Sequence, residues 1–550
     1  MPDDFQNTLY YGDNLHILKE YIEDESIDLI YLDPPFNSNQ TYNVLFKETN
    51  GTNAASQIRA FEDTWHWDMA AASSFHSIMG SGGKTADALL SLERLLGHND
   101  LMAYLAMMAP RLKELYRVLK STGTIYLHCD NTAGHYLKIL LDSIFGPENF
   151  VNEIIWQKIR TTKAQTIGFG KVHDSIFVYK KSDNPTFNQK FRQFDEGYIN
   201  SHYTLDPETG RMIQLVSLLQ GGQGPARKFG DLLLEPPTGM HWIWGQQRID
   251  KAWAEGRIRF TSGGRPRKVQ FLDEMRGDII DDIWTDIYPI NSQARERLGY
   301  PTQKPEALLE RIILASSNEG DVVLDPFCGC GTTISIAQRL DRKWIGIDIT
   351  HLAIALMNYR LKNSFPEKDL NYRIIGQPES LADAKILAAE DPYGFQWWVL
   401  GKFDAKLIEQ KKGADKGIDG KLYFRSDKDQ AGGYEQIIFS VKGGHVTVSQ
   451  VRDLIGVIQR EKASIGAFIT LDSPTRPMRE EAASAGFYQS KELGAKRYPR
   501  IQILTIEEIL SGKKIDCPPY ALNEGNVTIK RAPKVIKVKQ KAKHANLDQF

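Results

Sequence analysis

Short apolar runs that end at a polar residue recur along the first 160 residues. Residues 9–11 run into Gly12, Asp13 and Asn14, and the apolar residues of 27–32 run into Asp33. Residues 101–119 repeat apolar side chains at helical spacing, and residues 124–128 form a further apolar run after a turn. Strands that alternate with helices in this way predict an α/β fold with a parallel sheet.

Three segments of the chain depart from this alternation of strands and helices. Residues 37 to about 95 form a long polar insertion with a Gly/Ser stretch, which we expect to be a mobile or functional loop. Residues 161–275 have no regular period, whereas α/β patterning returns over 276–375 and, after a break near Pro378, continues to about residue 515. Residues 516–550 are rich in lysine, which predicts a disordered tail that contacts phosphate weakly or only aids solubility.

The irregular segment interleaves basic and aromatic side chains. This mixture suits a nucleic-acid surface, because basic groups contact phosphate while aromatic rings stack on bases. A solvated surface with buried tryptophans fits the same pattern equally well. The residues concerned are Arg160, Lys163, Arg257, Arg259, Arg265, Arg267 and Lys268, together with Trp242, Trp244 and Trp253.

Composition narrows the class of protein. The 550 residues predict three or four domains, and 41% apolar with 25% charged residues is typical of a soluble globular protein. No run of about 18 apolar residues occurs, and the polar start MPDDFQNTLY argues against a signal peptide, so we expect a cytoplasmic protein. Four cysteines are too few for a disulfide framework. The net charge of −1 means that any nucleic-acid surface must be local.

The stretch YLDPPFNS at residues 31–38 ends its strand abruptly. Proline fixes φ, removes a backbone donor and restricts the preceding residue, so we expect a stiff, extended corner. This corner holds the Asp33 carboxylate, proline carbonyl groups and the Phe36 ring in fixed relation. Taken alone, it predicts either a strand-ending turn or a site that grips a flat, amine-bearing substrate.

A second motif, DVVLDPFCGCGTT, occupies residues 321–333. An apolar strand ends at Asp325, glycines allow a ligand to approach the backbone closely, and a helix opens at Thr332. About 20 residues later a further strand ends at Asp348, where nucleotide-binding α/β folds place an acid on ribose hydroxyls. Gly329 and Gly331 lack the third glycine of a dinucleotide motif, so a dehydrogenase is disfavoured.

Together, DPPF and DPFCGCGTT closely resemble the amino-methyltransferases of DNA, which methylate an exocyclic amine with S-adenosylmethionine. Residues 12–15 (GDNL), residues 300–305 (YPTQKP) and the stretch YLAMMAPRLKELYRVLKSTGTIYLHCD resemble further segments of that family. DPPF precedes the glycine loop by about 290 residues, which is the permuted, β-type order, similar to modification subunits of type III restriction systems. The resemblance covers about residues 8–375. It implies a Rossmann-like S-adenosylmethionine methyltransferase fold with an inserted target recognition region.

The resemblance also implies roles for single residues. Asp33 and the Pro34 carbonyl would accept the two hydrogens of a base amine, Pro35 would keep the corner rigid, and Phe36 would stack on a base flipped out of the duplex. An aspartate at the first position favours adenine N6 in this family, although the cytosine N4 amine fits the same chemistry. The implied cofactor-binding residues are Asp13, Lys304, Pro305, Asp325, Phe327, Gly329, Gly331, Thr332 and Asp348.

Residues 380–515 resemble Mrr-type restriction endonuclease domains of the PD-(D/E)xK fold through GADKGIDG, FSVKGG, VRDLIGVI and IGAFITL. We expect a helix at 396–410, a strand at 436–441 and a helix from residue 449. The resemblance makes Asp419 a Mg²⁺ ligand and Lys442 a catalytic residue. Ser440 stands where such nucleases carry an acid or amide, and a hydroxyl is a weak Mg²⁺ ligand. Glu409 or Gln450, on the flanking helices, could supply the missing ligand instead. An active nuclease and a degenerate, DNA-binding domain both fit.

We therefore expect five parts along the chain: a methyltransferase catalytic part (1–160), a target recognition region (161–275), a cofactor-binding part (276–378), an Mrr-like endonuclease-fold domain (379–515) and a basic tail (516–550). The expected function is site-specific methylation of adenine N6 in double-stranded DNA, serving restriction–modification or host defence. The alternatives are cytosine-N4 methylation and a solitary methyltransferase with an inactive C-terminal domain. A second copy of the chain and a restriction subunit are the candidate protein partners.

Overall fold

The computed structural model describes residues 5–35, 66–160, 168–291, 294, 296–298, 300, 302–365, 370–403, 405–407, 417–425, 434–489 and 496–518. The chain divides into two compact units, one of residues 1–186 with 283–550 and one of residues 187–282. The domain boundaries expected at residues 160, 275, 378 and 515 remain predictions. No helix among the described residues is both long and apolar enough to cross a membrane.

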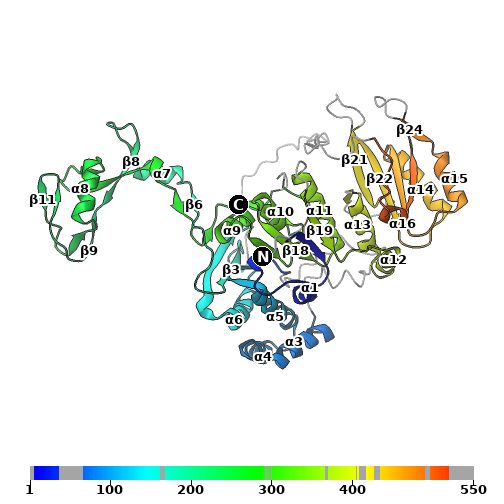
Figure 1. The fold of residues 1–550 in the computed structure, drawn as a ribbon, viewed down its shortest axis with the longest axis horizontal. Coiled ribbons are helices and arrows are strands. Elements are labelled where there is room, and N and C mark those ends of the chain that lie inside the picture. Colours follow the sequence, from blue (N-terminus) through cyan, green and yellow to red (C-terminus); the bar gives the residue numbers. More distant parts are fainter. Residues whose placement is uncertain are drawn as a thin grey trace, which may run out of the picture. The chain divides into compact units, whose positions relative to one another are not determined.

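A nine-stranded sheet forms the centre of the first unit, with the order β16-β4-β5-β3-β2-β17-β18-β1-β19 (Figure 1). Its strands are β1 (Asn7–Tyr11), β2 (Ile27–Leu32), β3 (Leu119–Cys129), β4 (Phe150–Gln157), β5 (His173–Lys180), β16 (Ile283–Trp284), β17 (Val322–Asp325), β18 (Lys343–Asp348) and β19 (Tyr372–Ile375). All neighbours are parallel except β5, which is antiparallel to β3 and β4. The α/β methyltransferase-like fold is thus confirmed, with a mixed rather than a purely parallel sheet.

Helices cover the sheet because its central strands are apolar on both sides. Every residue of β2 and of β17 is buried, as expected of parallel strands with helices on both faces. The covering helices are α1 (Asn14–Tyr21), α5 (Asp100–Val118), α6 (Gly134–Phe145), α9 (Glu306–Ser316), α10 (Thr332–Arg339) and α11 (His351–Ser364). The carboxyl ends of β2, β17, β18 and β1 consequently meet at one edge, which positions the site described below.

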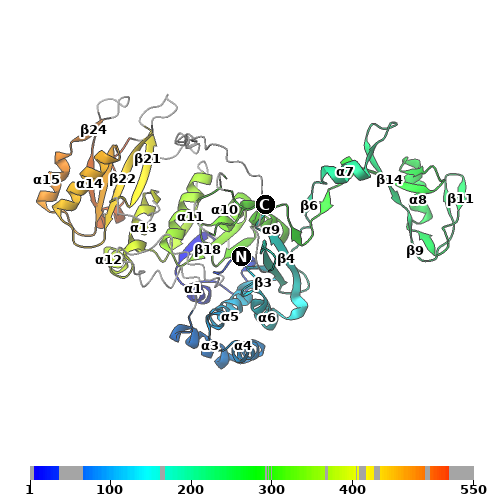
Figure 2. The same ribbon diagram turned by 180° about the vertical axis from the view of Figure 1, so that it is seen from behind.

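The polar insertion expected to be a loop is partly helical, so that expectation is wrong for its second half. Helices α3 (Met69–Ser81) and α4 (Lys84–Leu96) pack on α5 (Figure 2). Asp68 caps α3 through the N–H groups of residues 70 and 71, and apolar residues at helical spacing (Ala71, Phe75 and Ile78) are buried. The Gly/Ser stretch is the break between the two helices. Residues 37–65 lie outside the described residues.

The second unit, residues 187–282, is built mainly from short strands. Its elements are β6 (Phe191–Arg192), α7 (Glu196–His202), β7 (Thr204–Leu205), β8 (Met212–Ser217), β9 (Leu219–Gly221), β10 (Arg227–Phe229), β11 (Leu232–Leu234), β12 (Met240–Trp242), α8 (Gln246–Ala254), β13 (Ile258–Phe260), β14 (Pro266–Phe271) and β15 (Asp278–Ile279). Its largest sheet has the antiparallel order β13-β14-β8-β7. Trp242 is buried in a small core with Phe229 and Ile249, so this tryptophan is structural.

Residues after 380 form a separate sheet with the order β20-β21-β22-β23-β26. Its elements are α12 (Leu381–Glu390), α13 (Pro392–Lys402), β20 (Lys406–Leu407), β21 (Gly420–Arg425), β22 (Tyr434–Lys442), α14 (Val448–Arg460), β23 (Ile465–Thr470), α15 (Arg476–Ser484), β24 (Phe487–Gln489), β25 (Arg497–Pro499), β26 (Ile501–Thr505) and α16 (Ile506–Leu510). The helix expected at 396–410 is misplaced. It begins at Pro392, because Asp391 caps it through the N–H of Gly394, and it ends at Lys402.

Candidate active site

The Asp33 carboxylate lies directly after β2 and is held from one side only. Lys304 Nζ forms an ion pair with Asp33 Oδ2, and both side chains are largely buried. Asp33 Oδ1 is also buried, yet it has no hydrogen-bond partner among the described residues. Buried carboxylate oxygens are normally paired, so Oδ1 is an acceptor that a ligand would complete. Lys304, which the sequence placed among the cofactor-binding residues, is paired with the Asp33 carboxylate, and its role toward a cofactor stays a prediction. Phe36 falls outside the described residues.

A buried polar chain lies behind the Asp33 corner and crosses four adjacent strands. The Tyr31 hydroxyl lies 2.9 Å from His128 Nδ1, and His128 Nε2 lies 3.2 Å from Asp174 Oδ2. Lys158 Nζ donates to Asp174 Oδ1 at 2.5 Å. Burial alone would raise the pKa of Asp174, but the hydrogen bonds and charges of His128 and Lys158 lower that pKa to about 2. Asp174 is therefore ionised at neutral pH and anchors the chain.

The sequence analysis did not predict this row of hydrogen-bonded side chains. The available signal was the presence of polar residues inside two apolar strand patterns, His128 within YLHC and Asp174 within HDSIFVY. Tyr31 lies two positions before Asp33, at the end of the same strand. These hydrogen-bonded side chains therefore hold β2, the strand that precedes the DPPF corner, in place.

The glycine loop after β17 is closed by two carboxylates. Asp325 accepts hydrogen bonds from the Thr333 hydroxyl (2.5 Å) and the Phe327 N–H (3.1 Å). Asp348 accepts from the Gly329 N–H at 2.9 Å and from the Thr350 N–H at 2.9 Å. Burial raises the pKa of Asp325 to about 7 and that of Asp348 to about 6. These two acids shape the loop.

Gly329 and Gly331 are required by the backbone of this loop. Their φ values are +50° and +72°, in the left-handed region that favours glycine. A Cβ at Gly331 would lie 2.4 Å from Met357 Cγ, so no larger residue fits unless the Met357 side chain moves. Thr332 opens α10 as expected, but its hydroxyl accepts from Arg360 at 2.9 Å and is buried.

The N-terminal GDN segment is clamped to the same loop. Asp13 caps α1 and forms an ion pair with Arg111 at 2.7 Å. The Asn14 amide donates to the Pro326 carbonyl at 2.8 Å, and Arg111 Nε donates to Asn14 Oδ1 at 2.6 Å. Arg111 was not singled out in the sequence, although an arginine directly after the apolar stretch YLAMMAP was its signal. Asp13 is thus brought beside the DPF loop from more than 300 residues away.

The remaining expected residues have structural positions at the same edge. Pro305 is the N-cap residue of α9, next to Lys304. Phe327 is partly buried and packs against the main core cluster. The structure therefore brings Asp33, Lys304, the glycine loop, Asp348 and Asp13 to one edge of the sheet; their roles toward a cofactor remain predictions.

The second expected site, in the C-terminal sheet, shows no set of metal ligands in its described part. Asp419 Oδ2 accepts from the Val441 N–H at 2.7 Å and lies 3.9 Å from Lys442 Nζ. Ser440 is buried, and the Gln450 amide is engaged by the Thr447 N–H at 2.9 Å in a capping box. No group of three His, Cys, Asp or Glu side chains suited to a metal occurs among the described residues, which do not include residue 409. The side chains that are described do not fit Mg²⁺.

The strand order and the loop define a nucleotide-binding α/β class, and comparison with known proteins narrows it. The model of the N6/N4 methylase family, described as DNA methylase, matches residues 27–358, and the chain belongs to this family. A second model, described as NACHT-associated inactive Restriction Endonuclease 1, matches residues 395–511. The C-terminal part is therefore similar to an inactive endonuclease family, and its likeness to Mrr-type domains stays a prediction.

The chain is also similar in sequence to individual DNA-modifying proteins. The chain is 34% identical to the type II methyltransferase M.EcaI of Enterobacter cloacae over 45% of this chain and 54% of that protein. It is 26% identical to the StyLTI Mod subunit, a type III restriction-modification enzyme of Salmonella typhimurium, over 61% of this chain and 50% of the relative. It is 24% identical to the DNA adenine methyltransferase YhdJ of Escherichia coli over 62% of this chain and 78% of that protein. The chain spans about half the length of the first two relatives.

Among solved structures, the cytosine-N4-specific PvuII DNA methyltransferase is similar. It is 13% identical, with a TM-score of 0.32, over 67% of this chain and 94% of that chain.

Removing the centre of the buried chain should destabilise the first unit. His128→Leu would leave the Tyr31 hydroxyl and one Asp174 oxygen without their partners, and we expect the free energy of unfolding to fall by about 3 kcal/mol. Tyr31→Phe removes only one hydrogen bond and should cost about 1 kcal/mol. Urea titration of both variants and of the double variant measures this. Because the two residues share one network, the costs should be less than additive, and full additivity would contradict a connected chain.

Proposed function

We propose that the chain transfers a methyl group from S-adenosylmethionine to adenine N6 in double-stranded DNA. The observation that carries this proposal is the buried Asp33 Oδ1, which has no hydrogen-bond partner among the described residues and lies at the sheet edge that also carries the glycine loop. Membership of the DNA methylase family supports the same chemistry. The role in restriction–modification or defence is part of the proposal, and it is supported by the Mod subunit among the relatives.

Two acceptors on the DPPF corner make the base amine nucleophilic. The lone pair of an exocyclic amine is delocalised into the ring, which makes the free amine a poor nucleophile. Asp33 Oδ1 accepts one amine hydrogen and the Pro34 carbonyl accepts the other, so the nitrogen moves toward tetrahedral geometry and its lone pair becomes available. Lys304 occupies Asp33 Oδ2, and it therefore selects Oδ1 as the oxygen that faces the substrate. After transfer the amine must lose a proton, for which Asp33 Oδ1 is the adjacent acceptor.

The side chains and backbone at the sheet edge fit S-adenosylmethionine. When bound, this cofactor supplies an electrophilic methyl group on a sulfonium that leaves as a neutral thioether. Left-handed glycines at 329 and 331 allow close backbone approach, and the first turn of α10 offers unpaired N–H groups. Asp348 would hold ribose hydroxyls, and Asp13, fixed by Arg111, would lie at the same edge of the sheet. Pro305 and Phe327 would border the ligand from α9 and from the DPF turn.

The choice of adenine rests on the aspartate that opens the DPPF motif. In this family that residue accompanies adenine N6 methylation more often than cytosine N4 methylation. The relative YhdJ, whose name states adenine, supports this choice, whereas the PvuII enzyme is cytosine-N4-specific. A buried acceptor pair serves either amine equally well, so the base is settled only by product analysis.

We further propose that residues 380–515 contact DNA or a protein partner without cutting DNA. Ser440 in the central strand, the occupied Gln450 amide and the match to an inactive endonuclease family all favour this alternative over a working nuclease. A cleaving partner, such as a restriction subunit, would then supply any restriction activity. This assignment keeps Asp419 and Lys442 as structural residues of β21 and β22.

Loss of either member of the ion pair should lower transfer without loss of the cofactor. Asp33→Asn removes an anionic acceptor and should reduce kcat by about 10²–10³-fold. Lys304→Met should reduce kcat by about tenfold or more, because Asp33 Oδ2 then competes with Oδ1 for the substrate. Transfer of a labelled methyl group to unmethylated DNA measures both.

Lys304→Arg is the matched control, since it keeps the charge and should retain more activity than Lys304→Met. The KM for S-adenosylmethionine should stay within about threefold of wild type in all three variants. A large rise in this KM with an unchanged kcat would return Lys304 to the cofactor site and refute its role at Asp33.

Cofactor binding should weaken as the pH falls through about 6. Burial raises the pKa of Asp348 to about 6, so below this pH the carboxyl is protonated and no longer a charged acceptor for ribose. The affinity for S-adenosylhomocysteine, measured by calorimetry from pH 8 to pH 5, should fall by about tenfold or more. Asp348→Asn should bind weakly and lose the step near pH 6, so that any remaining pH dependence is centred near 7, where Asp325 titrates. An equally steep pH profile in this variant would exclude Asp348 as the titrating group.

The purified protein should not cleave DNA in the presence of Mg²⁺ or Mn²⁺. Asp419→Ala should leave methyl transfer unchanged and lower the free energy of unfolding by about 1–2 kcal/mol, because the Val441 N–H loses its acceptor. Nicking and linearisation of plasmid DNA, with and without methylation, tests the first statement. Metal-dependent cleavage that disappears in Asp419→Ala would show that the domain is an active nuclease.

A further inference from the structure

Residues 187–282 contain equal numbers of basic and acidic residues, so their net charge does not mark a DNA-binding face. Their basic side chains nevertheless fall into two groups, which differ in whether a carboxylate neutralises them. The structure describes every residue of this unit, so the two groups can be separated by their ion pairs.

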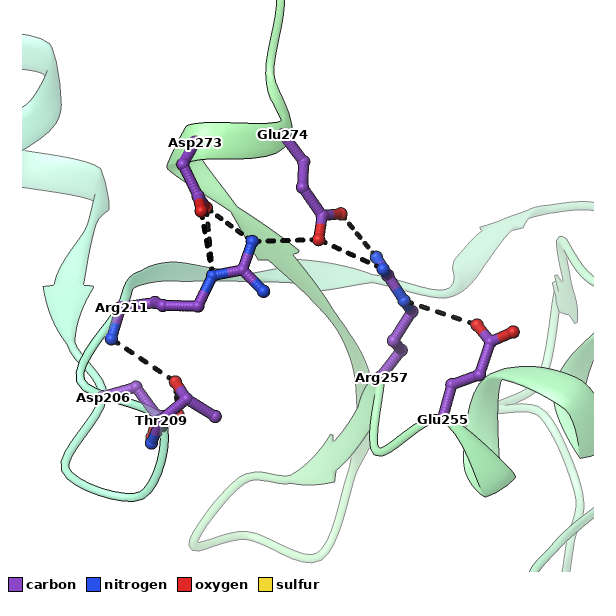
Figure 3. A network of polar contacts seen from close by, with 7 residues as sticks. All are labelled: Asp206, Thr209, Arg211, Glu255, Arg257, Asp273 and Glu274. Atoms are coloured by element: carbon purple, nitrogen blue, oxygen red, sulfur yellow. Dashed lines mark hydrogen bonds and ion pairs between the residues drawn. The ribbon is translucent and has the colours of Figure 1, made fainter.

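The first group is neutralised within the unit (Figure 3). Arg211 lies 2.7 Å from Asp273 and 2.9 Å from Glu274, and Arg257 lies 2.6 Å from Glu274. Figure 3 also shows Arg257 paired with Glu255. Arg259, outside that view, pairs with Asp206 at 2.5 Å and with Glu208. Arg257 and Arg259 were expected on a nucleic-acid surface, but they brace the unit.

The second group has no carboxylate partner among the described residues, and two of its members lie on the ring of one tryptophan. The Arg248 guanidinium carbon lies 4.5 Å from the centre of the Trp244 ring, and Lys268 Nζ lies 6.0 Å from it. Neither cation takes part in an ion pair within residues 187–282 or with any other described residue. We call these three residues the Trp244 cluster. Trp244 is partly buried against the small core, which fixes the position of the ring.

The Trp244 cluster and the neutralised network lie on opposite faces of β14. Neighbouring side chains of a strand point to opposite faces, so Lys268 faces away from Val269 and Phe271. The Phe271 ring carries the Arg211 guanidinium at 3.7 Å, which places the network on the face opposite Lys268. The paired Arg211 therefore lies on one side of β14, and Lys268, which has no ion pair among the described residues, lies on the other.

Two further basic residues extend the charged face. The exposed Lys228 is tied to the start of α8, because its backbone N–H and C=O bond to the Gln246 side chain at 2.8 Å and 2.7 Å. Arg227, next to it, has a buried Nε with no hydrogen-bond partner among the described residues. Neither has a carboxylate partner there, so the charge near the Trp244 cluster is not cancelled by its surroundings.

Two cations on one aromatic ring repel each other, and nothing within the unit compensates this repulsion. An anionic ligand with several separated charges would do so. Phosphates of a DNA backbone provide such charges, and contacts to them orient a protein on the duplex without reading the base sequence of the DNA. The aromatic ring keeps the cations in place and excludes water from one side, which strengthens each contact.

We propose that the Trp244 cluster, with Lys228 beside it, is the surface through which residues 187–282 grip the phosphate backbone of duplex DNA. The opposite face, with Arg211 and Arg257, does not contact DNA. This inference rests on the proposed function, because it assigns the DNA substrate of that function to one face of the inserted unit.

The test compares two pairs of substitutions that remove equal charge from the same unit. Arg248→Gln with Lys268→Gln alters the cluster. Lys190→Gln with Arg276→Gln is the matched control, since these two cations also lack a carboxylate partner among the described residues but lie near β6 and β15. Binding of a fluorescently labelled duplex of mixed sequence is measured by anisotropy over a range of salt concentrations, and thermal unfolding verifies that both variants are folded.

Each phosphate contact contributes about 0.9 to the slope of log K against log salt, so the cluster variant should lose about 2 from this slope. The control variant should keep the wild-type slope. Equal losses in both variants, or no loss in the cluster variant, would overturn the assignment of this face. Methyl transfer by the wild-type protein is recorded in parallel. If the wild type transfers no methyl group but the cluster variant alone loses slope, the proposed function fails while the DNA face stands.

Discussion

Parallel pairing of β2, β17, β18 and β1 is the constraint on which the candidate site depends. In parallel strands all carboxyl ends lie at one edge, so the residues that follow each strand meet there regardless of their distance in the chain. Asp33 follows β2, the glycine loop follows β17, Asp348 ends β18 and Gly12-Asp13 follow β1. The register between β17 and β2 joins Leu324 to Ile30, which brings DPPF and DPFCGCGTT side by side. With another register between β17 and β2, the two motifs would not lie next to each other.

Within that edge, the asymmetric environment of Asp33 determines what the site can do. Lys304 binds one oxygen, and the other is buried without a partner in the part of the chain that the structure describes. A carboxylate with both oxygens bound would have no acceptor left for a substrate, and one in free solvent would have no fixed orientation. The buried chain from Tyr31 to Lys158 supports this arrangement from behind, across β2, β3, β5 and β4. Substrate chemistry and strand stability are therefore linked at the same corner.

Much of the fold could be predicted from the sequence, because short apolar runs that end at Asp33, Asp325 and Asp348 mark parallel strands whose ends form a site. The resemblance of the motifs supplied the permuted order. The Lys304–Asp33 pair was not predictable, since it joins residues 271 positions apart and Lys304 belongs to no helix or strand. The same limit explains Arg257 and Arg259, which look like part of a DNA surface in the sequence but pair with Glu274 and Asp206, 17 and 53 positions away. Helices α3 and α4 were missed because their polar composition hid a narrow apolar stripe.

The central claim is that the acceptors at Asp33 activate the exocyclic amine of adenine. Its most direct test is expression of the full chain in a bacterial host that lacks DNA methylation, followed by enzymatic digestion of the DNA and mass spectrometry of the nucleosides. The account predicts N6-methyladenine, in amounts that depend on Asp33. N4-methylcytosine in its place, or unmodified DNA from cells that contain the folded protein, would contradict it.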